Sequence, residues 1–418
     1  MKKSTLIILV FAVFALISCG EKKEEENIYE KKDGDTETSD DSEKQDYQSR
    51  PDGNTENDEE STNDEEVSDD ASDDLTDIDN QPDDRSDEDE TQTPDEDEAD
   101  EDADTDDGTV IGNDDDTDEG TVCPASYGIT KESDIALIKD CNTIEGQLVI
   151  QNFPGTAITG LENLRTVKGD FNILTSPDLV SLEGFKNLET VGGGMYVLEN
   201  NSLSDLSDLE SLKRVEGWLH IKNNAKMTKI SLPALQYAGQ FMVVDNNEMT
   251  EPDLPEITEC GDFFQIITND KLTSIASLKK LKKVGERLQI SGNYLLKSLD
   301  GLDNLETVEG VLRLTTGKAL TDIKKLSNLT AVGGLEITGN DLLTSLEGLE
   351  KITEIPGGAL VGGEKLSSLK GLENVTEIGG KLWINGAKEI TTLTELSNLD
   401  NIGGDLEISF NLKLISLQ

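Results

Sequence analysis

One motif of about 24 residues is repeated along the chain, and it constrains the fold more than any other sequence feature. In the copy at residues 284–308, Leu288 and Ile290 alternate with polar neighbours, as in a half-buried strand. Asn293 follows, and apolar residues then recur at every third position as far as Val308. One copy cannot bury its own apolar side chains, so the copies must stack on one another.

Every copy has a residue equivalent to Ile290. These equivalents are Ile150, Ile173, Val197, Ile221, Val243, Ile266, Ile290, Leu314, Ile337, Val361, Ile384 and Ile408. Successive equivalents lie 22 to 24 residues apart, which is within the period of leucine-rich repeats. The sequence therefore predicts a mostly β fold, a parallel β-solenoid of about twelve turns within residues 123–418.

Asparagine and glycine recur at fixed places in the repeat. Asparagines at one corner are Asn200, Asn224, Asn269, Asn293, Asn340 and Asn411. Stacked amides at such a corner can bond the backbone of adjacent turns, so we expect these asparagines to be structural. Glycines before the strands are Gly169, Gly193, Gly217, Gly310, Gly334, Gly380 and Gly404. We expect a positive φ at these glycines, which only glycine adopts without steric cost.

Residues 1–18 have the pattern of a secretory signal peptide. Two lysines precede an apolar run from Leu6 to Ile17, which is too short to span a membrane comfortably. The run ends in Leu-Ile-Ser-Cys, which resembles the lipobox of bacterial lipoproteins. The resemblance implies that Cys19 carries acyl chains such as palmitate, and two or three chains anchor a protein firmly. The alternative is an ordinary signal peptide with an incidental cysteine.

The expected location is the bacterial cell envelope, at the exposed surface of the outer membrane. Gly20 is not the aspartate that is associated with retention in the inner membrane of enterobacteria. The segment 23–25, Lys-Glu-Glu, also resembles the lysine-plus-acidic export tag of some surface lipoproteins.

The segment from Cys19 to residue 122 is predicted to be a disordered acidic linker. Residues 21–122 hold 47 acidic and 7 basic side chains, a net charge of −40, whereas residues 123–418 have a net charge of −14. Such a segment has too little apolar surface to fold, and its like charges repel. The acidity also argues against a nucleic-acid partner, because phosphate binding needs a basic face.

The stretch from Asp102 to Gly108 has the alternating aspartates of a calcium loop. Its glycine falls at the seventh place rather than the sixth, and no glutamate occupies the twelfth. We therefore expect weak, diffuse association of divalent cations with the linker, and no shaped metal site.

The first residues of the repeat domain, 123–141, are predicted to form an N-terminal cap. Ile135, Leu137 and Ile138 indicate a short helix that closes the end of the solenoid. Exported chains keep disulfides, so Cys123 and Cys141 are the natural pair.

The order cysteine, short helix, cysteine and then Ile-Glu-Gly-x-Leu-x-Ile resembles the start of receptor L domains. These domains are the ligand-binding modules of the insulin and epidermal growth factor receptors, and the resemblance covers about residues 123–418. It implies a right-handed solenoid that presents a sheet face to a partner. The sequence has no cysteine-rich module, transmembrane helix or kinase, so signalling is not implied.

No residue set in the sequence points to catalysis or to a cofactor. His220 is the one histidine in the sequence, and no acidic residue stands beside it in its column. Cys260 shares the apolar column of Val284 and is expected to be a buried hydrophobe rather than a reactive thiol. Glu336 and Glu407 lie three turns apart, roughly 14 Å at sheet spacing, which is too far for paired-carboxylate chemistry. We therefore expect a protein that is not an enzyme.

The outward face of the sheet is where binding is expected. Its central column reads Val149, Asn172, Tyr196, His220, Met242, Gln265, Gln289, Arg313, Glu336, Leu360, Trp383 and Glu407. Large apolar residues gather in the third to sixth turns, where we predict a ligand-binding patch. We define the aromatic patch as Tyr196, Leu198, Trp218, His220, Met242, Val244, Phe263 and Ile267. Contiguous apolar surface of this kind is usually an interaction site, and Trp and Tyr often dominate binding.

The alternatives for the aromatic patch are that a loop, the linker or a second copy covers it, or that its residues only reflect β-propensity. At the level of function, we expect a surface-tethered binding or adhesion lipoprotein whose ligand is an unknown protein or glycan. The alternative is a structural coat protein with a cation-associating spacer and no specific ligand. The sequence ends at Gln418, after an apolar turn without a polar cap, so either this end pairs with another molecule or the sequence is incomplete.

Overall fold

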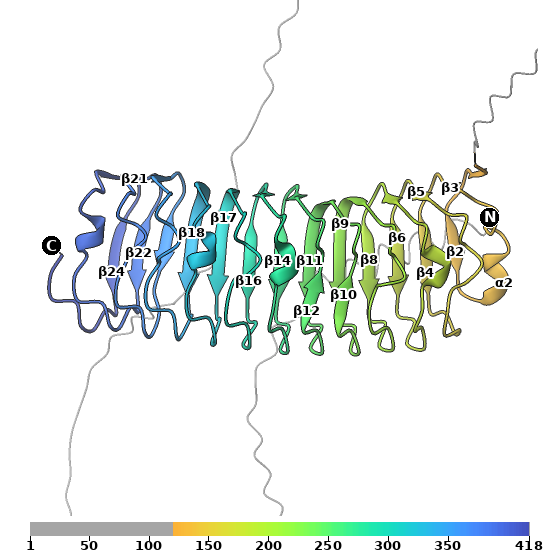
Figure 1. The fold of residues 1–418 in the computed structure, drawn as a ribbon, viewed down its shortest axis with the longest axis horizontal. Coiled ribbons are helices and arrows are strands. Elements are labelled where there is room, and N and C mark those ends of the chain that lie inside the picture. Colours follow the sequence, from red (N-terminus) through yellow and green to blue (C-terminus); the bar gives the residue numbers. More distant parts are fainter. Residues whose placement is uncertain (1–119, 418) are drawn as a thin grey trace, which may run out of the picture. The chain divides into compact units, whose positions relative to one another are not determined.

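Each copy of the motif contributes one strand to a parallel sheet along residues 120–417, the part of the chain that the computed structural model describes (Figure 1). The twelve strands are β4 (Leu148–Gln151), β6 (Phe171–Leu174), β8 (Met195–Leu198), β9 (Arg214–Lys222), β11 (Tyr237–Val244), β14 (Phe264–Ile267), β16 (Leu288–Ser291), β17 (Thr307–Thr315), β18 (Ala331–Thr338), β20 (Ala359–Val361), β22 (Leu382–Asn385) and β24 (Leu406–Ser409). The predicted signal peptide, Cys19 and the linker up to residue 119 lie outside the described residues.

The register of this sheet follows the sequence repeat. Ile290 pairs with Ile266 on one side and with Leu314 on the other. The remaining equivalents pair with their neighbours in the same way, from Ile150 to Ile408. A slip of one residue would turn the buried side of a strand toward solvent, so the alternation holds every turn in register. The predicted parallel β-solenoid is confirmed.

A thirteenth turn precedes the twelve. Strand β2 (Tyr127–Ile129) pairs with β4, and Ile129 is fully buried opposite Ile150. The sequence analysis placed these residues in the cap, because a three-residue strand without the preceding half of the motif gives no periodic signal.

The N-terminal cap combines a strand, a helix and a disulfide. Strand β1 (Val122–Cys123) pairs with β3 (Thr143–Ile144), and a disulfide joins Cys123 to Cys141 with their Cα atoms 5.8 Å apart. Helix α2 has only four residues, Glu132–Ile135. Ile138 is buried beyond its end, but Leu137 is 69% exposed, so the expectation that Leu137 helps to close the solenoid is wrong. Leu137 and Ile138 both lie beyond the end of this one-turn helix, so the helix does not direct the two side chains toward the core together.

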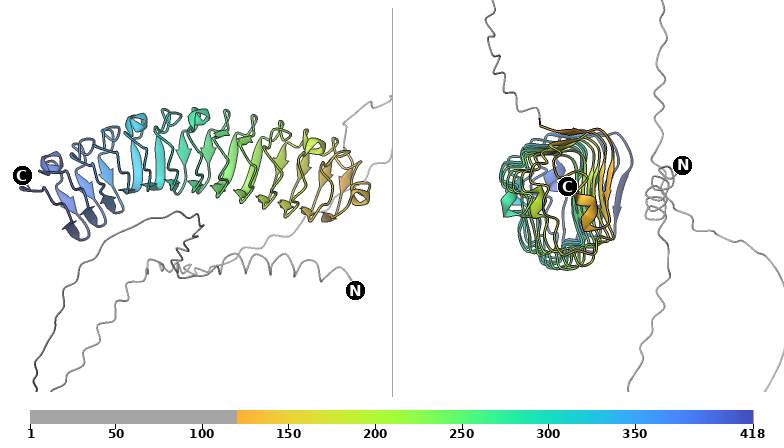
Figure 2. Two further views of the ribbon diagram at one scale, coloured as in Figure 1. Left: turned by 90° about the horizontal axis from the view of Figure 1, so that it is seen from below. Right: turned by 90° about the vertical axis from the view of Figure 1, so that its right-hand side faces the viewer.

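Shorter elements complete each turn. Two-residue strands that stack beside the main strands are β5 (Thr166–Val167), β7 (Thr190–Val191), β13 (Glu259–Cys260), β15 (Lys283–Val284), β19 (Glu354–Ile355), β21 (Glu377–Ile378) and β23 (Asn401–Ile402). A further parallel pair is β10 (Lys229–Ser231) with β12 (Glu251–Asp253). One-turn 3₁₀ helices are η1 (Glu183–Phe185), η2 (Ala276–Leu278), η3 (Lys324–Leu326) and η4 (Thr394–Leu396). Seen along its side, the solenoid bends, with the wide sheet on the inner side and the helical turns on the outer side (Figure 2).

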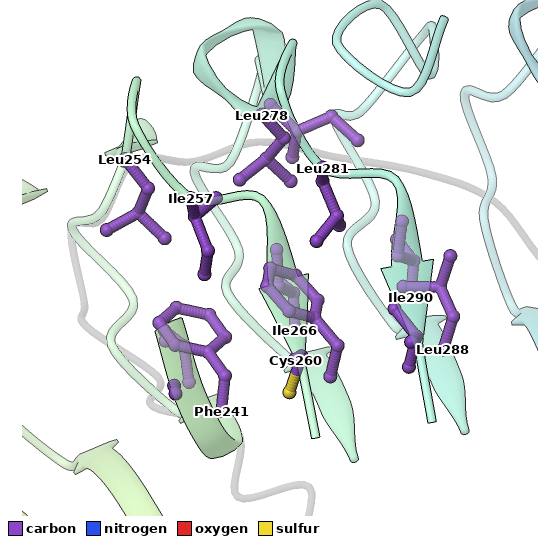
Figure 3. Packing of buried hydrophobic residues seen from close by; sticks show 14 of the residues in the cluster. Phe241, Leu254, Ile257, Cys260, Ile266, Leu278, Leu281, Leu288 and Ile290 are labelled. Atoms are coloured by element: carbon purple, nitrogen blue, oxygen red, sulfur yellow. The ribbon is translucent and has the colours of Figure 1, made fainter. Parts of the chain in front are cut away.

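The core is one continuous column inside the coil. Leu288 from the strand and Leu281 from the opposite wall are completely buried, and both point into the interior (Figure 3). Phe241 and Phe264, one turn apart, stack with ring centroids 4.6 Å apart. Because each turn packs only on its two neighbours, the core extends along the solenoid instead of converging on a centre.

The predicted asparagine corner is present as a hydrogen-bonded ladder. Asn246 donates to the carbonyl oxygens of Ile221 and Val244, and its side-chain oxygen accepts from the backbone N–H of Asn224. The same pattern recurs at Asn200, Asn224 and Asn269, and each of these side chains is fully buried. The sequence analysis missed Asn246, which continues the ladder between Asn224 and Asn269.

The explanation expected for the glycines before the strands is wrong, because none of them has a positive φ. A Cβ on Gly193 would lie 2.8 Å from the carbonyl carbon of Gly169, so close approach of successive backbones requires glycine there. Positive φ occurs at four other glycines, Gly160, Gly301, Gly348 and Gly371, and otherwise directly after the strands. After the strands it is seen at Asn152, Thr175, Glu199, Asn223, Asp245, Thr268, Gly292, Thr316, Gly339, Gly386 and Phe410.

The last described turn leaves its apolar side chains in solvent. Phe410 and Leu412 are each 78% exposed, and Ile415 is 85% exposed. No further turn among the described residues packs against them.

Candidate binding surface

The predicted orientation of the aromatic patch is confirmed. Met195 and Leu219 are completely buried in the coil, whereas their neighbours Tyr196 and Trp218 lie on the outer surface of the sheet. Tyr196 is paired in register with His220, and His220 with Met242. The strands β8, β9, β11 and β14 therefore bring all eight residues of the aromatic patch onto four adjacent turns.

The aromatic side chains pack on one another and do not stand free in solvent. The rings of Trp218 and Phe263 are nearly parallel, with centroids 6.1 Å apart and 12° between their planes. Tyr196 and His220 meet edge to face at 6.3 Å, and Trp218 lies 6.3 Å from His220. All eight residues of the aromatic patch are half-buried. The expectation that the large apolar residues of the aromatic patch face water overestimates the exposed apolar surface.

Polar residues that the sequence analysis did not include share this surface. Gln240 is the register partner of Trp218 on the intervening strand, and Arg287 lies over the Phe263 ring at 5.7 Å. Lys222 separates Leu198 from Val244 in the flanking column. Counting two residues back from Met242 and Gln289 in the central column would have found Gln240 and Arg287. The signal was present in the sequence.

Four buried polar atoms lack a hydrogen-bond partner within residues 120–417, and all four lie at this surface. They are Asn172 Oδ1, His220 Nε2, Gln240 Oε1 and Arg287 Nε. Asn172 and Gln265 are expected to face outward, yet they are only 3% and 6% exposed. Buried polar groups are normally paired, so these four unpaired atoms, spread over the turns from β6 to β16, need an explanation.

Burial keeps His220 neutral at physiological pH. Desolvation, followed by repulsion from Lys222, lowers the pKa of its imidazole to about 4. Burial, and then the negative charge of Asp170, raises the pKa of the Tyr196 hydroxyl. Both rings are therefore uncharged at neutral pH, and the aromatic patch carries no formal charge of its own.

The charged groups at the edge of the aromatic patch are partly engaged already. Asp262 accepts a hydrogen bond from the Gln240 side chain at 2.8 Å. Lys222 lies 4.0 Å from the Asp245 carboxylate, and the Arg287 guanidinium covers one aromatic face. Acidic and basic groups are thus mixed around the aromatic patch, and neither sign dominates.

Cys260 lies beneath the sheet, in the core. Its side chain is fully buried, and burial raises the pKa of its thiol to about 12. A thiol with so little thiolate is a poor nucleophile, which agrees with the predicted hydrophobic role.

The carboxylates of the central column are held by separate cations. Glu336 pairs with Arg313 and Glu407 with Lys381, so the two carboxylates do not share a site. Within residues 120–417, no group of three His, Cys, Asp or Glu side chains has the geometry of a metal site. A search of the same residues for a helix long and apolar enough to cross a membrane also found none.

Comparison with known proteins gives one family match. Residues 140–206 match the model of the Receptor L domain family. No curated protein matches the sequence. Among solved structures, the chain is similar to one in "Crystal structure of TLR13-ssRNA13 complex", with 12% identity and a TM-score of 0.20. The match covers 64% of this chain and 60% of that one, and a TM-score this low supports no argument about ligand or function.

Proposed function

We propose that this protein is a ligand-binding or adhesion module whose partner contacts the aromatic patch. The observation that carries the proposal is the gathering of Tyr196, Trp218, His220 and Phe263 on adjacent turns of an outward sheet face. Elsewhere on the central column, Arg313 and Glu336 form an ion pair with each other, so these two side chains have fewer unpaired groups with which to contact a partner. The family match to Receptor L domain over residues 140–206 supports a role in recognition.

The module is proposed to be held at the surface of a bacterial cell. The lipobox-like ending at Cys19 supports lipid anchoring, and the acidic composition of the linker supports a solvated spacer. In this arrangement the solenoid stands away from the membrane, and its sheet face is open to a partner outside the cell.

The test is partner capture by a variant that lacks the two largest side chains of the aromatic patch. Trp218→Ala with Tyr196→Ala is expected to leave the circular dichroism spectrum unchanged and to abolish binding to cells or matrix. Leu360→Ala with Trp383→Ala is the matched control, because it removes an aromatic and an apolar residue from the central column outside the aromatic patch. Undiminished binding by the first variant would exclude the aromatic patch.

A structural coat protein remains the second candidate. The supporting observation is the set of Lys–Glu pairs between successive turns, such as Lys271–Glu248 and Lys280–Glu256, which stabilise a regular rod rather than a recognition site. Saturable binding of a partner to the purified solenoid favours the binding module. Assembly into a lattice with no saturable partner favours the coat.

A further inference from the structure

The unpaired polar atoms within and beside the aromatic patch restrict which kind of partner can cover it. Asn172 Oδ1 and Gln240 Oε1 are hydrogen-bond acceptors, and Arg287 Nε is a donor. His220 Nε2 offers a lone pair or a proton, depending on the tautomer. A partner with a purely apolar surface would displace water and leave these atoms unpaired, which weakens binding. A partner that carries hydroxyl groups can donate to the two amide oxygens and either donate to or accept from the imidazole.

The charge balance points in the same direction. Tyr196 and His220 are neutral, and Asp262 and Lys222 already have partners. The cations Lys222 and Arg287 are balanced by the carboxylates of Asp245 and Asp262, so a polyanion or a polycation would find no net excess of opposite charge here. The balance therefore favours an uncharged ligand.

Aromatic rings beside uncharged amides provide two kinds of contact at once. The faces of Trp218 and Tyr196 suit the C–H face of a saturated six-membered ring. The amides of Asn172 and Gln240 suit the hydroxyl groups at the edge of that ring. Successive turns repeat every ~4.8 Å along the sheet, which allows an extended chain of such rings to follow the column.

We infer that the aromatic patch binds a neutral oligosaccharide, with Trp218 stacking on a sugar ring and with Gln240 and Asn172 accepting hydrogen bonds from sugar hydroxyls. This inference rests on the proposed function and names the ligand class. The rings of Trp218 and Phe263 come together across the strand that carries Gln240, whose oxygen is buried. The indole must therefore move for the sugar to reach this oxygen, and its fluorescence reports the event. The Asn172 oxygen is buried too, so the side chains over it must also move when the sugar binds.

The experiment uses the full chain with Cys19→Ser to prevent lipidation and Trp383→Phe to leave Trp218 as the sole tryptophan. The probes are the neutral hexasaccharides cellohexaose, mannohexaose and chitohexaose, with hexagalacturonic acid as the acidic comparator. At least one neutral probe is expected to change the Trp218 emission saturably, and the acidic probe is expected to bind more weakly.

Two substitutions then test the amides. Gln240→Leu and Asn172→Leu are each expected to weaken binding of the neutral probe at least tenfold. Gln147→Leu is the matched control, because Gln147 holds the same position as Gln240 at the start of the first predicted turn. It is expected to bind as tightly as the parent. Folding of each variant is checked by thermal melting. If either Gln240→Leu or Asn172→Leu does not fold, the other still tests the inference.

The outcomes separate this inference from the proposed function. If no neutral hexasaccharide binds, or if the acidic one binds more tightly, the oligosaccharide assignment is overturned. If Trp218→Ala with Tyr196→Ala still abolishes capture of cells, the binding function stands with a ligand of another class. Equal weakening by Gln147→Leu and Gln240→Leu would also overturn the assigned role of the Gln240 amide.

Discussion

The indole of Trp218 and the phenyl ring of Phe263 lie almost parallel, 6.1 Å apart, although β11 runs between their turns. The two rings lean toward each other across the turn of Gln240, so the aromatic patch is a packed cluster of side chains. A cluster of this kind contributes to stability as well as to binding, and the two effects can be measured separately.

The first prediction concerns this ring pair. In a double-mutant cycle of Trp218→Ala and Phe263→Ala, the coupling free energy is expected to be about 0.5–1.5 kcal/mol, because stacked aromatic pairs contribute beyond their buried area. Urea unfolding followed by circular dichroism measures it. Trp218→Ala with Trp383→Ala is the control and should be additive, since the two residues are several turns apart. If the effects of Trp218→Ala and Phe263→Ala are additive, the contact between the two rings contributes no coupling free energy.

The second prediction concerns the asparagine ladder. Asn246→Ala removes two donated hydrogen bonds and the acceptor for the Asn224 backbone. The bonds to the Ile221 carbonyl and from the Asn224 N–H are buried, and the bond to the Val244 carbonyl is partly buried. Leaving those groups unpaired is expected to destabilise the protein by about 2–4 kcal/mol. The control is Asn201→Ala at an exposed position, where the loss should be under about 0.5 kcal/mol. Equal Tm values for the two variants would contradict a structural ladder.

The third prediction tests the alternation of inward and outward residues. Leu288→Asp places an unpaired carboxylate in the core and is expected to destabilise the protein by several kcal/mol. Gln289→Asp introduces the same group one residue later, on the outer side of the sheet, and should change the Tm far less. Thermal melting by circular dichroism compares the two, and an unchanged midpoint for Leu288→Asp would count against the inward assignment.

The fourth prediction is a pH dependence that comes from His220. Its folded-state pKa of about 4 lies below the ordinary value of 6.5, so between these values the unfolded chain binds more protons than the folded one. The full contribution of His220 to the free energy of unfolding is present above about pH 7 and is lost as the pH falls toward 4. At pH 5 the loss is about 2 kcal/mol.

Comparison with His220→Gln isolates this effect, because His220 is the one histidine in the sequence. Carboxylates titrate in both proteins, whereas the imidazole titrates only in the parent. Denaturant unfolding at pH 8 and pH 5 is expected to show a smaller drop in the variant. Identical drops would mean that the imidazole is already solvated in the folded state.

Most of the fold could be predicted from the sequence, because every copy of the repeated motif carries the same spacing of apolar residues. The pairing of Ile290 with Ile266 and Leu314 follows from the repeat length alone. The short strand β2 could not be predicted, because it lacks the first half of the motif. The glycine explanation was wrong because close approach and positive φ both favour glycine, and a sequence does not distinguish between them.

The candidate surface was predicted less completely. The columns that hold Tyr196 and Trp218 follow from counting, but the lean of one ring onto another depends on side chains 22 to 24 residues away. For the same reason, the burial of Asn172 and the unpaired oxygen of Gln240 were not predictable. Whether an outward side chain is covered depends on the sizes of its neighbours in the turns before and after it.

By itself, the sequence determined which side of each strand is sealed and how the turns align, since a period of 22 to 24 residues and an alternation of two leave only one register that buries the apolar side chains. The tertiary structure alone decided which outward residues meet, because contacts across turns depend on rotamers and ring tilts that are selected after stacking. In the folded structure, Trp218 packs against Phe263 and His220 is largely buried. The unpaired oxygens of Asn172 and Gln240 lie beside the rings.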